Sequence, residues 1–185
     1  MAESARIVVG VSGSPSSLEA LRAAEGEARR RGAELLAVLA WSPACGEIAS
    51  RRAPSSDLLA IWEQQACARL RNSFDEAFGG FPAGLVVRPF VVRADPGMAL
   101  VDIADRPEDL LVVGAGGRGW PTRLFHGSVS RYCVAHAVCR VLAVPPPALL
   151  AELPWGQRHR PSALPEELFQ GSTGTAPAKG STASD

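Results

Sequence analysis

The chain has 185 residues, of which 46% are hydrophobic and 21% charged, and its formal net charge is zero. This composition is ordinary for a globular protein, and the length predicts one domain of roughly 100–200 residues with some chain left over. Zero net charge without a basic stripe argues against nucleic acid or an anionic membrane as a partner. The sequence has no apolar run of about 18–20 residues and no signal peptide, so we expect no membrane span and a cytoplasmic location.

Short apolar runs alternate with segments of helical spacing along the first 145 residues. The runs are rich in β-branched residues, which is typical of buried parallel strands. In chain order we predict a strand over 6–12, a helix over 14–32, a strand over 33–41, a loop over 42–55, a helix over 57–78, a strand over 84–93, a short helix that begins at Asp95-Pro96, a strand over 109–115, a helix over 128–138 and a strand over 140–144.

Several residues fix the ends or the place of these elements. Ser14 can cap the first helix, Pro15 suits its first turn, and Gly32 suits its end. Pro89 disfavours a central place for the third strand, because proline cannot donate to the hydrogen-bond ladder. The helix over 57–78 carries large apolar residues at helical spacing, namely Leu58, Ile61, Trp62, Leu70 and Phe74.

Five strands that alternate with helices predict an α/β fold with a five-stranded parallel sheet and helices on both faces. We expect the strand order 3-2-1-4-5 of a Rossmann-like fold, which would put the crevice between strands one and four. Residues 1–147 would form this domain. Residues 148–185 form a Pro/Gly/Ser/Thr-rich tail, and we expect most of it to be disordered because its last part has too little apolar surface to bury.

The four cysteines and three histidines give no sign of a metal site or a disulfide framework. None of the cysteines belongs to a C-x-x-C pair, and the histidines are scattered. A structural zinc site needs clustered ligands, so we expect no bound metal. These residues are Cys45, Cys67, Cys133, Cys139, His126, His136 and His159.

The glycines after the fourth predicted strand spell G-x-G-x-x-G from Gly114 to Gly119. A dinucleotide-binding turn would also open a helix directly and have an acidic residue about 20 positions later. Pro121 interrupts such a helix, and no acidic residue occurs between Asp109 and Glu152. A phosphate-binding P-loop is excluded as well, because a lysine does not follow Gly119.

A longer pattern in the same stretch makes better physical sense. Gly114, two residues, Gly117, nine residues and Gly127-Ser128 follow one another. Consecutive exposed amides of a glycine turn form an anion-binding concavity, and a helix that starts at Ser128 would offer free N–H groups to phosphate. The pattern therefore predicts a site for successive phosphates.

This pattern and its flanks, "IVVGVSGSPSSLEALRAA", "DLLVVG" and "GSVSRYCVAHAVCRVLAV", resemble the universal stress protein domain family over about residues 5–145. The resemblance implies ATP as the ligand and a homodimer formed through the last strand, Arg140–Val144. That family usually has aspartate where Ser12 stands, and serine is a poor metal ligand, so the resemblance carries no magnesium role to Ser12. The nucleotide-binding residues that it implies are Gly10, Val11, Ser12, Ala40, Gly114, Ala115, Gly116, Gly117, Arg118, Gly119, Gly127, Ser128 and Val129.

The expected crevice offers no catalytic constellation. Catalysis needs a positioned base or nucleophile, and Ser12, Ser128 and His126 have no triad partner by spacing. We therefore predict a nucleotide-binding stress-response regulator without catalytic residues, and with at most slow ATP hydrolysis. Two alternatives stay open: an interaction protein of the same fold that binds no nucleotide, and a dinucleotide-dependent oxidoreductase.

Overall fold

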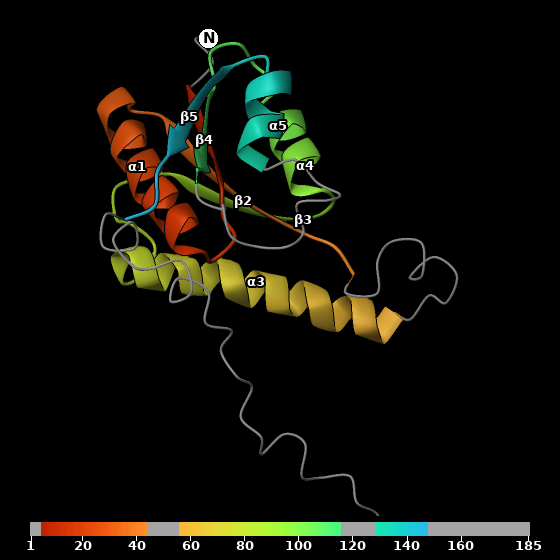
Figure 1. Cartoon of the computed structure of the whole chain (residues 1–185). Helices are drawn as coiled ribbons and strands as arrows, with labels where there is room; N and C mark the ends of the chain where they lie inside the picture. The colour runs from red at the N-terminus through yellow and green to blue at the C-terminus, as the bar shows by residue number, and fades with distance from the viewer. Residues whose placement is uncertain (1–4, 44–55, 116–128, 148–185) are drawn as a thin grey trace, which may run out of the picture. The chain divides into compact units, whose positions relative to one another are not determined.

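The computed structural model describes residues 5–43, 56–115 and 129–147 (Figure 1). No helix in these ranges is both long and apolar enough to cross a membrane. The described elements are β1 (Arg6–Gly10), α1 (Pro15–Arg31), β2 (Glu34–Trp41), α3 (Ser56–Phe78), β3 (Val87–Arg93), α4 (Pro96–Ile103), β4 (Leu110–Gly114), α5 (Val129–His136) and β5 (Arg140–Val144). Each predicted strand and helix is confirmed, with ends that differ by up to three residues. Most of the predicted 42–55 loop and the whole 148–185 tail lie outside the described residues.

The strands form one parallel sheet in the order β3-β2-β1-β4-β5, as the sequence predicts. Strand β1 lies at the centre, where Ile7 is level with Leu35 of β2 on one side and Leu110 of β4 on the other. The edge position predicted from Pro89 is confirmed, because β3 is the outer strand beside β2. Strand β5 forms the opposite edge.

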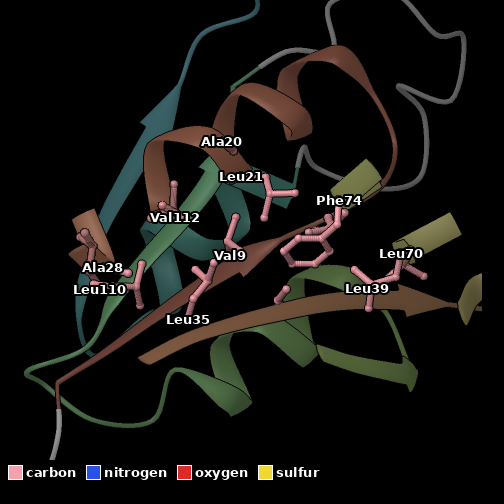
Figure 2. Packing of buried hydrophobic residues seen from close by; sticks show 14 of the residues in the cluster. Val9, Ala20, Leu21, Ala28, Leu35, Leu39, Leu70, Phe74, Leu110 and Val112 are labelled. Carbon is pink, nitrogen blue, oxygen red and sulfur yellow. The ribbon is translucent and has the colours of Figure 1, made fainter. Parts of the chain in front are cut away.

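Helices cover both faces of the sheet. On one face, α1 and α3 cover the larger core, in which Val9, Leu35 and Val112 of the strands are fully buried. Figure 2 shows the Phe74 ring of α3 reaching in among these side chains near Leu39. On the other face, α4 and α5 cover a smaller cluster. The inner strands β1, β2 and β4 are buried on both faces, which explains their nearly continuous apolar runs.

Helix α1 has the predicted cap at each end. The Ser14 hydroxyl accepts the N–H of Ser17 at 3.3 Å, and Pro15 follows it in the first turn. Gly32 ends the helix in the left-handed region with φ of 59°, where its N–H donates to the Ala28 and Arg29 carbonyls. Glycine adopts this conformation without the steric cost of a Cβ, which explains why the helix ends there.

The two halves of α3 differ in burial. Leu70 and Phe74 are buried, whereas Leu58 and Ile61 at the amino end are 49% and 47% exposed. The helix has 23 residues and is about 35 Å long. Strand β2 has eight residues and spans only about 26 Å. The helix is therefore longer than the sheet it packs on, and the helical spacing at Leu58 and Ile61 does not indicate burial.

A buried ion pair joins the start of β1 to the residue before β4, at the end of the sheet where the strands begin (the amino edge). The Arg6 guanidinium donates to both carboxylate oxygens of Asp109, at 2.9 and 2.5 Å, and to Asp105 at 2.5 Å. The Asp109 side chain is fully buried and also accepts the N–H of Arg106. Hydrogen bonding to Asp109 raises the pKa of the Arg6 guanidinium above its ordinary value, which reflects how strongly this pair stabilises the charged form.

The cysteines of α3 and α5 should differ in reactivity. Cys67 is exposed, whereas Cys133 is fully buried and burial raises the pKa of its thiol to about 11. Because the thiolate is the nucleophile, we expect iodoacetamide at pH 8 to alkylate Cys67 in the folded protein and Cys133 only after unfolding in urea. Mass spectrometry of the digested protein measures both sites. Equal alkylation of the two thiols in the folded state would contradict this packing of α5.

Candidate functional site

The carboxyl ends of β1 and β4 lie side by side where the strand order reverses. The chain leaves β1 for a strand on one side, β2, and β4 occupies the other side. The loops that follow β1 and β4 therefore leave the sheet in opposite directions. Open parallel sheets bind ligands at such a point, beyond the carboxyl ends of the strands. The structure brings together here the predicted residues Gly10, Val11, Ser12, Ala40, Gly114, Ala115 and Val129, while Gly116, Gly117, Arg118, Gly119, Gly127 and Ser128 lie outside the described residues.

Gly10 and Gly114 end the two central strands and allow helices to approach them closely. A Cβ on Gly10 would lie 2.9 Å from the Leu100 Cδ1 of α4. A Cβ on Gly114 would lie 2.7 Å from the backbone carbonyl carbon and oxygen of Ser16 in α1. The two glycines therefore have a packing role, and their contact with a ligand stays a prediction.

Serine hydroxyls organise the turn between β1 and α1. The Ser12 and Ser14 hydroxyl oxygens lie 3.0 Å apart, and the Ser12 N–H donates to the Ser17 hydroxyl at 3.2 Å. The Ser17 hydroxyl in turn donates to the Ser14 carbonyl at 2.9 Å. Ser12 itself is exposed. Its side chain thus lies in the turn after β1, at the carboxyl ends of the strands, and belongs to a network that also caps α1.

Strand β2 continues past the end of β1, so its last residues have N–H and carbonyl groups on the β1 side without a strand beside them. The last bond between the two strands runs from the Val11 N–H to the Val38 carbonyl at 2.8 Å. Successive residues of a strand direct their backbone groups to opposite edges. Ala40, two residues after Val38, therefore directs its N–H and its carbonyl to the side that β1 has left. Leu35 and Trp41 bond to the β3 side, as this alternation requires.

The glycine motif begins at the end of β4 and finishes at the start of α5. Gly114 is the last residue of β4, and the next N–H, of Ala115, donates to the Val144 carbonyl at the end of β5. Helix α5 begins at Val129, directly after Gly127-Ser128 in the sequence. The two ends of the motif are therefore fixed at the same edge of the sheet as Gly10 and Ala40.

The described part of the crevice does not fit a metal ion held by the protein. In the ranges that the structure describes, no three His, Cys, Asp or Glu side chains gather in a way that could bind one. Ser12 offers a neutral hydroxyl that already contacts Ser14. Divalent cations such as Mg²⁺ prefer carboxylate oxygens, and among the described residues at this end of the sheet Ser12 supplies none.

Sequence reasoning missed one residue at this edge, Arg69 of α3. Its aliphatic stem lies over Gly13, in the turn between Ser12 and Ser14. The residue is 56 positions away in the sequence and carries no motif. The one local signal is that Arg69 precedes the buried Leu70 in a helix, which does not by itself indicate which loop the side chain will meet.

The comparisons with known sequences agree on one family. Residues 3–145 match the model of the universal stress protein family. A universal stress protein from Mycobacterium tuberculosis is 36% identical over 135 residues, which cover 72% of this chain and 42% of the relative. Another from Mycolicibacterium smegmatis is 32% identical over 143 residues, which cover 76% of this chain and 45% of the relative. The chain thus spans less than half the length of these curated relatives.

Solved structures of similar fold point the same way. The universal stress protein UspA from Lactobacillus plantarum superposes with a TM-score of 0.58 at 26% identity, over 78% of this chain and 99% of that one. A universal stress protein crystallised in complex with cAMP superposes with a TM-score of 0.54 at 30% identity, over 75% of this chain and 95% of that one. The first shares the fold and the second also carries an adenine nucleotide.

Proposed function

Because the chain belongs to the universal stress protein family, we propose that it binds an adenine nucleotide, ATP, at the carboxyl ends of β1, β2 and β4. The observation that supports the proposal is where the chain enters and leaves the segment that carries the glycine motif. Gly114 ends β4 and Val129 begins α5 at the edge where the strand order reverses. The similar universal stress protein in complex with cAMP supports an adenine ligand.

The backbone of Ala40 is suited to hold the adenine ring. Its carbonyl accepts and its N–H donates on the side that β1 has left, two residues beyond the last β1–β2 bond. Adenine offers the complementary pair on its Watson–Crick edge, where the N6 amino group donates and the ring nitrogen N1 accepts. A ring in this place would extend the ladder of β2 in the way another strand would. Gly10, Val11 and Ser12 line the neighbouring end of β1.

The phosphates belong at the β4–α5 end of the crevice. The glycine motif supplies backbone N–H groups, and the amino end of α5 adds its free N–H groups and the positive end of its dipole. Gly117, Gly127 and Ser128 are the residues that we assign to this role. In this proposal their backbone N–H groups bind and orient the phosphates, and any magnesium arrives bound to the nucleotide.

The proposed role is regulatory, without catalysis beyond slow ATP hydrolysis. None of the described residues around the crevice forms a base–nucleophile pair of the kind that activates water or a hydroxyl. We further propose that β5 pairs with a second copy of the chain, because an edge strand otherwise leaves backbone groups without a strand partner. The cytoplasmic location stays a prediction.

A second candidate function follows from Ser12. A serine at the mouth, hydrogen-bonded into the α1 cap, would also suit a protein of this fold that binds no nucleotide and acts through protein contacts. Calorimetric titration with ATP separates the two. Saturable binding supports the first function, whereas no heat of binding at millimolar ATP supports the second.

Adenine recognition by Ala40 predicts selectivity between purines. Guanine has a carbonyl and a protonated ring nitrogen where adenine has its amino group and acceptor, so the Ala40 carbonyl and N–H would each face a like group. A site built on hydrogen bonds rejects a mismatched ligand strongly, and we expect ATP to bind at least about ten-fold more tightly than GTP. Competition between the two nucleotides for the protein measures the ratio. Equal affinity would remove Ala40 from the site.

A further inference from the structure

Arg69, in the middle of α3, lies over the turn that follows β1. Gly13 has φ of 78°, and a Cβ on it would lie 3.4 Å from the Cγ and 3.7 Å from the Cδ of Arg69. The stem of Arg69 thus rests on the residue of the turn that has no side chain. The guanidinium begins at the next atom beyond Cδ, so Arg69 carries its charge next to the turn that contains Ser12, Gly13 and Ser14. Figure 1 shows the amino end of α1 beside the carboxyl half of α3.

Buried neighbours fix the position from which Arg69 extends. Leu70, the next residue, is 3% exposed in the core beneath α3. The Ser73 hydroxyl, one turn later, donates to the Arg69 carbonyl at 2.8 Å and is itself close to Gly13. The backbone at Arg69 is therefore held against the β1–α1 turn, while its side chain remains exposed. Because the side chain is exposed beside this turn, its charge is accessible from solvent.

The charge of Arg69 is not balanced by the residues around it. Elsewhere, Arg22 pairs with Glu19 at 2.6 Å and Arg88 with Glu34 at 3.0 Å. Within the described ranges no carboxylate forms an ion pair with Arg69, and no acidic residue lies three or four positions from it along α3. The first turn of α1 has no acidic residue either. Within the described ranges, Arg69 therefore carries a positive charge at this turn without a carboxylate partner.

We propose that Arg69 binds a phosphate group of the nucleotide and sets the preference of the site for nucleotides over nucleosides. The inference rests on the proposed function, which assigns the adenine to Ala40 and the remaining phosphates to the glycine motif. Guanidinium N–H groups match phosphate oxygens in geometry and charge. Ser12 has no carboxylate to bind a metal ion near the phosphates. The positive charge of Arg69 would offset the charge of the phosphates instead.

The test compares adenosine with ATP in two variants of the full chain. For Arg69→Ala we expect affinity for ATP to fall about ten-fold and affinity for adenosine to stay unchanged, because adenosine has no phosphate. Arg71→Ala is the matched control: Arg71 is exposed on the same helix and lines a hollow beside Cys67. It should leave both affinities unchanged. Calorimetry gives both constants, and circular dichroism checks that each variant is folded.

The outcomes separate this inference from the function on which it rests. If the wild-type chain binds ATP and Arg69→Ala keeps the wild-type ratio of ATP to adenosine affinity, Arg69 has no phosphate role and the inference is overturned. An equal loss of ATP affinity in Arg71→Ala would also overturn it, since the effect would then be one of net charge. A wild-type chain that binds neither ligand overturns the proposed function itself.

Discussion

Replacing Asp109 by alanine should lower the free energy of unfolding by about 3–5 kcal/mol, the range measured when one partner of a buried ion pair is removed. The Asp109 side chain is fully buried and accepts two hydrogen bonds from Arg6 and one from the Arg106 N–H. Its loss leaves the guanidinium of Arg6, which is only 16% exposed, without its buried partner. Urea denaturation followed by circular dichroism measures the change.

Asp105→Asn is the control for this prediction. Asp105 binds the same guanidinium, but its side chain is 63% exposed, so water can replace it and stability should change little. Both variants should bind ATP as the wild type does when folded, because this ion pair lies at the amino edge of the sheet. If Asp105→Asn destabilised the protein as much as Asp109→Ala, burial would not decide the strength of this pair.

The second large effect is expected for Gly114→Ala, which should cost about 1–3 kcal/mol of stability and weaken nucleotide binding. The added Cβ would lie 2.7 Å from the backbone of Ser16. Because backbone cannot rotate away as a side chain can, the first turn of α1 must move from the end of β4. That movement displaces the Ser12–Ser14 turn at the mouth of the crevice. Thermal unfolding and ATP titration of the same sample measure both effects.

Gly26→Ala serves as the matched control for Gly114→Ala. Gly26 lies within α1, and the nearest atom to its added Cβ is the flexible Arg30 Nη1 at 3.8 Å. Alanine there should stabilise the helix by roughly 0.5–1 kcal/mol and leave nucleotide binding unchanged. Destabilisation by both alanines would mean that the close approach of α1 to β4 is not the cause.

Most of the fold could be predicted because its local signals agree with its tertiary structure. Ser14, Pro15 and Gly32 cap α1 as their chemistry predicts, and Pro89 lies on an edge strand because it cannot donate to a central ladder. The apolar spacing of a helix is less informative about burial, because it does not depend on what the helix packs against. The apolar spacing of α3 continues to Leu58, but it contains no information on where the sheet beneath the helix ends.

The positions of the proposed site residues follow from strand ends more readily than from packing. Gly10 and Gly114 could be placed at one end of the sheet because neighbouring parallel strands end together at the switch point. The close approach of Ser16 to Gly114, and of Arg69 to Gly13, could not. Both contacts join residues that lie far apart in the sequence, and no local pattern indicates which distant residue each will meet.

The most direct test of the proposed site is an amide NMR titration of the ¹⁵N-labelled full chain with ATP. Adenine nucleotide binding at the switch point predicts saturable shifts for the amides of Ala40, Gly114 and Val129, with little change at Arg6 and Asp109 on the opposite edge of the sheet. Saturation with the same constant at all three amides would join adenine and phosphate recognition in one site. No shift at millimolar ATP, or shifts confined to residues away from these strand ends, would contradict the account.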